Sequence, residues 1–142
     1  ICGFLTEQDP VWDDDFAIEK MHQHIRHLTD DSQNKIQLKT GRINSFESAL
    51  FVEIIDEDDV LLKLRHLLGQ SCDEIAPLVY CPHLTLGLYH QDFNSDLIFK
   101  RINSIEQKSF EFSVDQLTFG TYNAKILQGQ LYPFHQFQLG DV

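Results

Sequence analysis

The stretch that organises the chain is Cys81-Pro82-His83-Leu84-Thr85-Leu86-Gly87-Leu88-Tyr89. Its polar and apolar residues alternate with a period of two, which is typical of a β-strand with one buried face. The alternation predicts that Leu84, Leu86 and Leu88 point into a core. The opposite face then carries His83, Thr85, Gly87 and Tyr89. We therefore expect an imidazole, a hydroxyl, a glycine without a side chain and an aromatic ring in a row on one face of this strand.

Such a row has the groups needed to hold a phosphate. An imidazole transfers protons, a hydroxyl donates a hydrogen bond to an oxygen, and a glycine inside a strand often marks a close approach to the backbone. Short motifs also match by chance, and spacing alone favours an ordinary half-buried strand with a polar outer face. The two interpretations stay open at this point.

Charge limits the partners that the chain can have. With 22 acidic and 11 basic residues, the net charge is −11. This charge repels long nucleic acid, whose binding depends on phosphate neutralisation. A nucleic-acid substrate would therefore be a small nucleotide or a chain end. The acidic runs 13–15 and 56–59 precede predicted helices, where carboxylates complement the helix dipole.

Residues 1–142 are expected to form a single domain, because this length supports one substantial core. No apolar run approaches the ~20 residues of a membrane span, and no signal peptide is recognisable. The three cysteines show no C-x-x-C spacing, so reduced thiols, a cytoplasmic location and no structural metal are predicted. We expect a monomer. The chain begins at Ile1 inside an apolar run, which we interpret as an N-terminal truncation.

Periodicity predicts an α+β fold. The predicted strands are 1–5, 35–46 with a bend at Gly41, 49–55, 81–89, 110–119 and 126–139, and the predicted helices are 14–28, 59–68 and 95–105. Asp58 or Asp59 is expected to cap the second helix. A polar turn is expected at 120–124, and Pro133 suggests an edge or a bend in the last strand.

Histidines outside the opening stretch have simpler explanations. His24 and His27 share a face of the first helix, but no third ligand joins them, so a solvated face is expected there rather than a metal site. His27-Leu28-Thr29 has the letters of a His-x-Thr motif but lies at a helix end. His135 has Phe134 and Phe137 as near neighbours and is expected to be packed or at an edge.

The predicted elements repeat in order. A strand end, a helix and two strands in the first half correspond to Gly87–Tyr89, a helix and two strands in the second. The strand and helix that precede His83 have no counterpart, so a complete first half would need one more strand and helix upstream of Ile1. This order predicts two pseudo-symmetric sheet lobes around a central cleft, with helices packed outside.

Pro82-His83-Leu84-Thr85-Leu86, in this order of elements, resembles the two-histidine phosphoesterase superfamily. That superfamily includes RNA 2′,3′-cyclic phosphodiesterases and 2′-5′ RNA ligase-like proteins. The resemblance implies catalysis by two histidines, one acting as acid and one as base, with hydroxyls that hold the phosphate and with no metal or other cofactor. His83 and Thr85 would form one half of the site, and the second His-x-Thr/Ser motif would lie upstream of Ile1.

Within this resemblance, further residues are candidates for substrate contact. Tyr89 would either stack on a base or form an aromatic rim, and Gly87 would admit the ligand. Arg42, together with Lys39, would supply positive charge, and Tyr122 is a weaker rim candidate. The predicted function is hydrolysis of a 2′,3′-cyclic phosphate or a 2′-5′ phosphodiester of a nucleotide or RNA end. The alternatives are a nucleotide-binding module without turnover, and an unrelated α+β domain with a structural His83.

Overall fold

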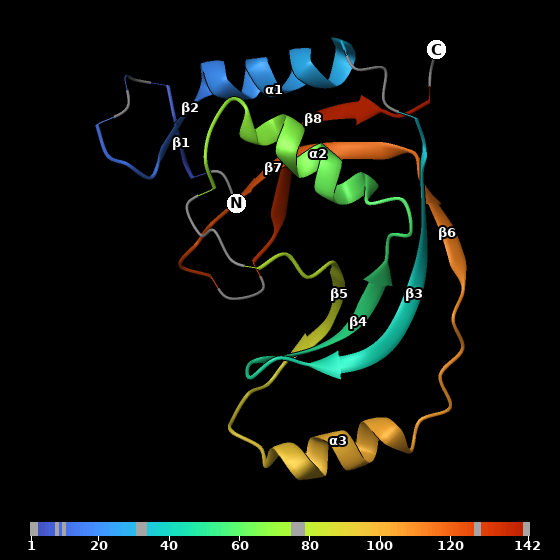
Figure 1. The fold of residues 1–142 in the computed structure, drawn as a ribbon. Coiled ribbons are helices and arrows are strands. Elements are labelled where there is room, and N and C mark those ends of the chain that lie inside the picture. The colour runs from blue at the N-terminus through green and yellow to red at the C-terminus, as the bar shows by residue number, and fades with distance from the viewer. Residues whose placement is uncertain are drawn as a thin grey trace. The chain divides into compact units, whose positions relative to one another are not determined.

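The computed structural model describes residues 3–7, 9, 11–30, 34–74, 79–126 and 129–140. Over these residues the chain forms three helices and eight strands (Figure 1). In chain order they are β1 (Phe4–Thr6), β2 (Asp15–Ala17), α1 (Ile18–Asp30), β3 (Ile36–Ser45), β4 (Ala49–Ile55), α2 (Val60–Gly69), β5 (His83–Leu88), α3 (Ser95–Asn103), β6 (Glu111–Val114), β7 (Gln116–Tyr122) and β8 (Leu131–Gln138). Helices mix with mainly antiparallel strands, which confirms the predicted α+β class.

The chain divides into two compact units. Unit 1 comprises Ile1–Ile36, Leu62–Leu78 and Val114–Val142, and unit 2 comprises Gln37–Leu61 and Val79–Ser113. Among the described residues, unit 2 carries a four-stranded sheet and unit 1 carries two strand pairs, so the pseudo-symmetry of the lobes stays a prediction. None of the described helices has the length and apolar character that crossing a membrane requires.

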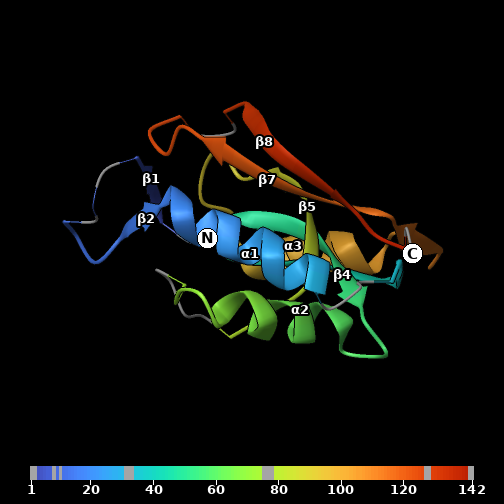
Figure 2. The same cartoon turned by 90° about the horizontal axis from the view of Figure 1, so that it is seen from above.

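Unit 1 is built around α1. Its buried residues Met21, His24 and Leu28 follow the helical repeat and form one stripe. Figure 2 shows α1 between the β7–β8 pair and α2, and the His24 ring lies 6.1 Å from that of Phe119 on β7. His24 is only 1% exposed, so its expected place on a solvated face is wrong. The ring of Phe16 lies 5.6 Å from that of His24.

Unit 2 is built around a sheet of order β5-β4-β3-β6. β4 is an internal strand, in agreement with its nearly continuous apolar sequence. β3 pairs with β4 as an antiparallel hairpin, with a register shift between Thr40 and Ile43. This bulge confirms the bend predicted at Gly41, because an extra residue in one strand bends that strand.

Two acidic runs have local roles that differ from the predicted ones. Asp56, not Asp58 or Asp59, caps α2, because its carboxylate accepts hydrogen bonds from the Val60 and Leu61 backbone N–H groups at 3.0 and 2.7 Å. Asp15 is the first residue of the short strand β2 rather than the start of a helix. Its carboxylate accepts from the backbone N–H groups of Trp12 and Val11, and these hydrogen bonds lower its pKa.

The predicted strand 110–119 is two strands. β6 ends at Val114 and β7 begins at Gln116, and these strands belong to different sheets. β7 also continues to Tyr122, through the residues expected to form a turn. The alternation changes phase at this point, because Asp115 and Gln116 are adjacent polar residues, so the sequence carries a sign of the break that the prediction of one strand missed. In β8, Pro133 lies at a register shift, as its missing N–H requires.

The prediction that Leu84 and Leu86 are buried is wrong, because these side chains are 48% and 54% exposed. β5 lies at an edge of the sheet, so a neighbouring strand covers it from one side only. The alternation identified the strand correctly. Periodicity does not say whether a strand is central or at an edge.

Candidate functional site

His83 and Thr85 lie on one face of the unit 2 sheet. The register pairs His83 with Glu53 and Thr85 with Phe51, and directly paired residues in an antiparallel sheet share a face. His83 and Thr85 are both exposed. The edge position of β5 thus presents an imidazole and a hydroxyl, two residues apart, on an accessible surface.

The His83 imidazole has a defined tautomer. Its Nδ1 lies 2.7 Å from the backbone carbonyl oxygen of Cys81. A carbonyl oxygen only accepts, so Nδ1 carries the proton, and in the neutral ring Nε2 is left as the acceptor. A neutral imidazole in this state can take a proton at Nε2. The backbone just before β5 therefore prepares His83 for proton transfer.

Two aromatic rings flank His83. The ring centroids of Phe46 and Phe51 lie 5.0 and 5.4 Å from that of His83, with interplanar angles of 83° and 66°. Phe46 also stacks on Phe51 at 4.0 Å and 21°. Phe51 is 3% exposed, whereas Phe46 is 39% exposed. The imidazole is thus held by a carbonyl on one side and by two aromatic rings.

Phe46 is held in place by the turn between β3 and β4. Its backbone N–H donates to the Ala49 carbonyl at 2.8 Å, and its own carbonyl accepts from the Ser45 hydroxyl at 2.8 Å. The Ser45 oxygen lies 2.8 Å from the Tyr89 hydroxyl. Because Ser45 already donates to Phe46, the Tyr89 hydroxyl is the donor in this pair. Sequence reasoning did not identify Phe46, since the turn brings it to His83 from a distant part of the chain.

The predicted row on β5 ends at Thr85. Thr85 pairs with Phe51 but Gly87 pairs with Leu50, so Leu86 is an extra residue that reverses the alternation. Tyr89 reaches Ser45, which pairs with Leu50 on the other face, so Tyr89 does not share the face of His83 and Thr85. A methyl group added at Gly87 would meet no atom within 4 Å. Open space, rather than close packing, surrounds this glycine.

Two basic candidates lie on β3. Arg42 is exposed and occupies the bulge opposite Glu53. Lys39 pairs with Ile55, which is two residues from Glu53, and so shares the face of Glu53 and His83. In a sheet of order β5-β4-β3, both residues lie two strands away from His83. The carboxylate of Glu53 is one strand away, and sequence reasoning did not identify it.

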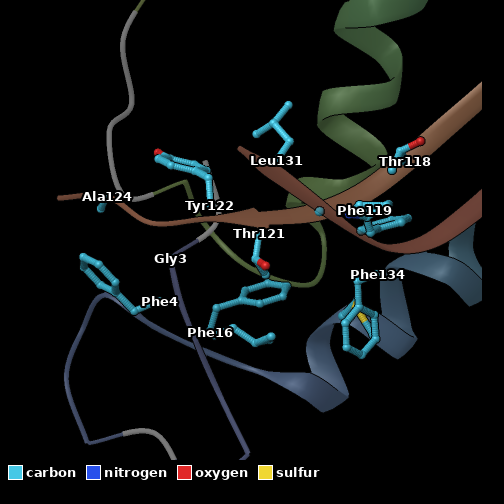
Figure 3. A pocket seen from close by; sticks show the side chains of 14 residues that line it. Gly3, Phe4, Phe16, Thr118, Phe119, Thr121, Tyr122, Ala124, Leu131 and Phe134 are labelled. Atoms are coloured by element: carbon cyan, nitrogen blue, oxygen red, sulfur yellow. The ribbon is translucent and has the colours of Figure 1, made fainter. Parts of the chain in front are cut away.

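Tyr122 lies in unit 1, at the end of β7. It is 47% exposed and lines a mainly apolar pocket of about 790 Å³. Figure 3 shows Tyr122 and Thr121 from β7 together with Phe4 and Phe16 from the N-terminal strands around this pocket. Tyr122 and His83 therefore belong to different units.

The remaining histidines have separate surroundings. The His24 Nε2 lies 3.6 Å from the Cys72 sulfur, and its Nδ1 is buried without a hydrogen-bond partner. The His27 Nδ1 lies 3.2 Å from the Ser71 hydroxyl. His27-Leu28-Thr29 lies within α1, and the Thr29 hydroxyl donates to the Ile25 carbonyl, so this motif is helical as expected. Half-buried His135 lies 6.4 Å from the Phe119 ring.

An exposed histidine and threonine lie two residues apart on the edge strand of an α+β protein, as the resemblance to two-histidine phosphoesterases leads one to expect. Comparison with protein families agrees, because the family described as the 2′-5′ RNA ligase superfamily matches residues 4–125. This match covers most of the chain, so the chain belongs to the 2′-5′ RNA ligase superfamily. Membership indicates in general a phosphoesterase- or ligase-like protein. A comparison with curated proteins gives no match.

Proposed function

We propose that the protein is a metal-independent phosphoesterase that hydrolyses a 2′,3′-cyclic phosphate or a 2′-5′ phosphodiester at a nucleotide or RNA end. The observation that carries this proposal is the hydrogen bond of 2.7 Å between His83 Nδ1 and the Cys81 carbonyl. It leaves Nε2 of an exposed imidazole ready to exchange a proton, with a threonine hydroxyl on the same face. The negative charge of the chain supports a small substrate rather than long nucleic acid. We propose that the enzyme is a monomer and acts in the cytoplasm.

His83 acts as one member of an acid–base pair. In one substrate orientation, its Nε2 takes a proton from water as the water oxygen bonds to phosphorus. The bond from phosphorus to the leaving ribose oxygen breaks, and the other member of the pair, acting as acid, protonates that oxygen. In the opposite orientation, protonated His83 is the acid, and Cys81 still accepts from Nδ1. The second histidine is implied by the family and would come from a second His-x-Thr/Ser strand.

Thr85 holds the phosphate. Its hydroxyl would donate to a non-bridging oxygen, whose negative charge grows as the water attacks. Such a hydrogen bond to a charged group contributes about 1–3 kcal/mol. Arg42, Tyr89, Gly87 and Tyr122 remain weaker candidates for substrate contact, because none of them lies beside His83 on its face of the sheet.

The test is turnover of nucleoside 2′,3′-cyclic phosphates by the full-length protein in EDTA. We expect His83→Ala to lower kcat by roughly 10²–10⁴-fold, the usual contribution of one acid or base. Thr85→Ala should lose about 1–3 kcal/mol of transition-state stabilisation. His90→Ala is the matched control, because His90 is an exposed histidine in the loop after β5.

Undiminished turnover by the His83→Ala variant would remove this residue from the chemistry. A wild-type protein that binds cyclic nucleotides and turns none of them over would be the alternative, a nucleotide-binding module on the same fold.

A further inference from the structure

We propose that Glu53 makes the His83 site selective for monoanionic phosphodiesters over dianionic phosphomonoesters. This inference rests on the proposed function, because it assigns the charge state of the ligand at that site. It also implies that the product of hydrolysis, a monoester, is repelled from the site in which it forms. Charge discrimination would thus favour both substrate binding and product release.

The position of Glu53 follows from the sheet register. Glu53 pairs directly with His83, and directly paired residues have Cβ atoms about 4.5–5.5 Å apart on the same face. Glu53 is the only charged residue of Ala49–Ile55 in β4, and His83 is the only titratable residue of His83–Leu88 in β5. Of the charged residues on β4 and β5, Glu53 is thus the one paired directly with the imidazole.

The Glu53 side chain is held rather than free. Its Oε1 accepts a hydrogen bond of 2.7 Å from the Asn44 amide, in a partly buried position. A methyl group at Gly41 would lie 3.0 Å from the Glu53 Cβ and 3.3 Å from its Oε2. The absence of a side chain at Gly41 therefore leaves room for the carboxylate to pack over β3. Among the described residues, no salt bridge neutralises Glu53.

The basic residues of β3 lie farther from His83. Neighbouring strands are about 4.8 Å apart, so Lys39 and Arg42 lie about 10 Å or more from β5. Lys39 is also displaced along the strand, since it pairs with Ile55. Glu53 starts from β4, one strand spacing from β5, and its carboxylate packs toward Asn44 on β3. Among the charged residues of β3 and β4, the one whose backbone lies nearest to His83 is therefore negative.

This charge discriminates between ligands. A cyclic phosphate or another phosphodiester carries one negative charge, whereas a monoester carries about −1.5 to −2 at neutral pH. For an additional charge about 7 Å from the carboxylate, Coulomb's law at an effective dielectric constant of about 40–80 gives roughly three- to eightfold weaker binding. The effect should decrease with ionic strength, because the site is open to solvent.

The test uses two ligands that are not turned over and that differ by one methyl group and one charge. They are 2′-deoxyadenosine 3′-phosphate and its methyl ester, titrated calorimetrically at pH 8 and low salt. We expect Glu53→Gln in the full-length protein to raise the affinity for the monoester, relative to the methyl ester, by roughly three- to eightfold. Glutamine keeps an acceptor for the Asn44 amide, and thermal unfolding checks that the fold is retained.

Glu111→Gln is the matched control. It removes the same charge from β6, which is separated from β5 by β4 and β3. About three strand spacings, or ~14 Å, should leave the affinity ratio within about twofold of the wild-type value.

An unchanged ratio in Glu53→Gln would overturn the inference. Weaker binding of both ligands would also overturn it, since Glu53 would then be an acceptor that contacts the ligand. A wild-type protein that binds neither ligand would refute both this inference and the proposed function. If the ratio shifts as expected but no cyclic phosphate is hydrolysed, charge selection stands and the phosphoesterase proposal fails.

Discussion

Phe46 should control how the His83 imidazole is held. Its ring stacks on Phe51 at 4.0 Å and meets His83 at 5.0 Å with an interplanar angle of 83°. Aromatic pairs in such geometries contribute about 0.5–1.5 kcal/mol beyond area burial. Phe46→Ala removes one of the two rings that flank His83, while the hydrogen bond from Nδ1 to the Cys81 carbonyl remains.

The magnitude follows from these contacts. If the ring contact holds the imidazole with about 0.5–1.5 kcal/mol, its loss lowers the population of the productive ring orientation by up to about 2- to 12-fold. We expect kcat to fall by that factor and KM to change little. Stability should fall as well. Phe46 is 39% exposed, so about 60% of a ~200 Å² side chain is covered, which corresponds to at most about 3 kcal/mol.

The assay compares Phe46→Ala, Phe46→Leu and Phe46→Tyr in turnover of a 2′,3′-cyclic phosphate, with ¹⁵N NMR of the His83 ring as a readout that needs no activity. Phe46→Tyr keeps the ring and should retain kcat within about twofold, and the NMR spectrum should keep the Nδ1–H tautomer. Phe46→Leu restores part of the burial but no ring. A rise in KM without a loss of kcat would refute the reasoning and assign Phe46 to substrate contact.

Two further predictions concern stability. Burial among aromatic rings lowers the pKa of His24, so the unfolded state binds its proton more readily than the folded state. Above about pH 6.5, the contribution of neutral His24 to the unfolding free energy should therefore be fully present. As the pH drops from there toward the lowered pKa, the unfolding free energy should fall by at most about 1.4 kcal/mol per pH unit. Urea unfolding of His24→Leu should show a flatter pH dependence, and an equal slope in both proteins would contradict this. In unit 2, the hydroxyl of buried Thr40 accepts from the Phe110 backbone N–H at 3.0 Å. Thr40→Val leaves this donor unsatisfied and should cost about 1–3 kcal/mol in urea unfolding, whereas an unchanged midpoint would show that water replaces the bond.

The sequence by itself determined the type and order of most elements. Alternation identified β3 and β5, a nearly continuous apolar run identified β4, and helical spacing identified α2, because these patterns depend only on the local sequence. The His-x-Thr pair of β5 was found for the same reason. Positions 83 and 85 lie on one face of a regular strand, and the structure leaves both of them exposed.

The tertiary structure decided the register and the edge position of β5, which the pattern of residues within one strand does not contain. The extra residue at Leu86 moved Tyr89 to the other face, and the edge position of β5 left Leu84 and Leu86 exposed. The surroundings of His83 come from partners that are distant in sequence, since a turn brings Phe46 to its ring and the register places Glu53 beside it. Register and edge position depend on pairing between strands. The strands of a pair are separate in sequence, so the pattern within one strand does not reveal which neighbours it will have.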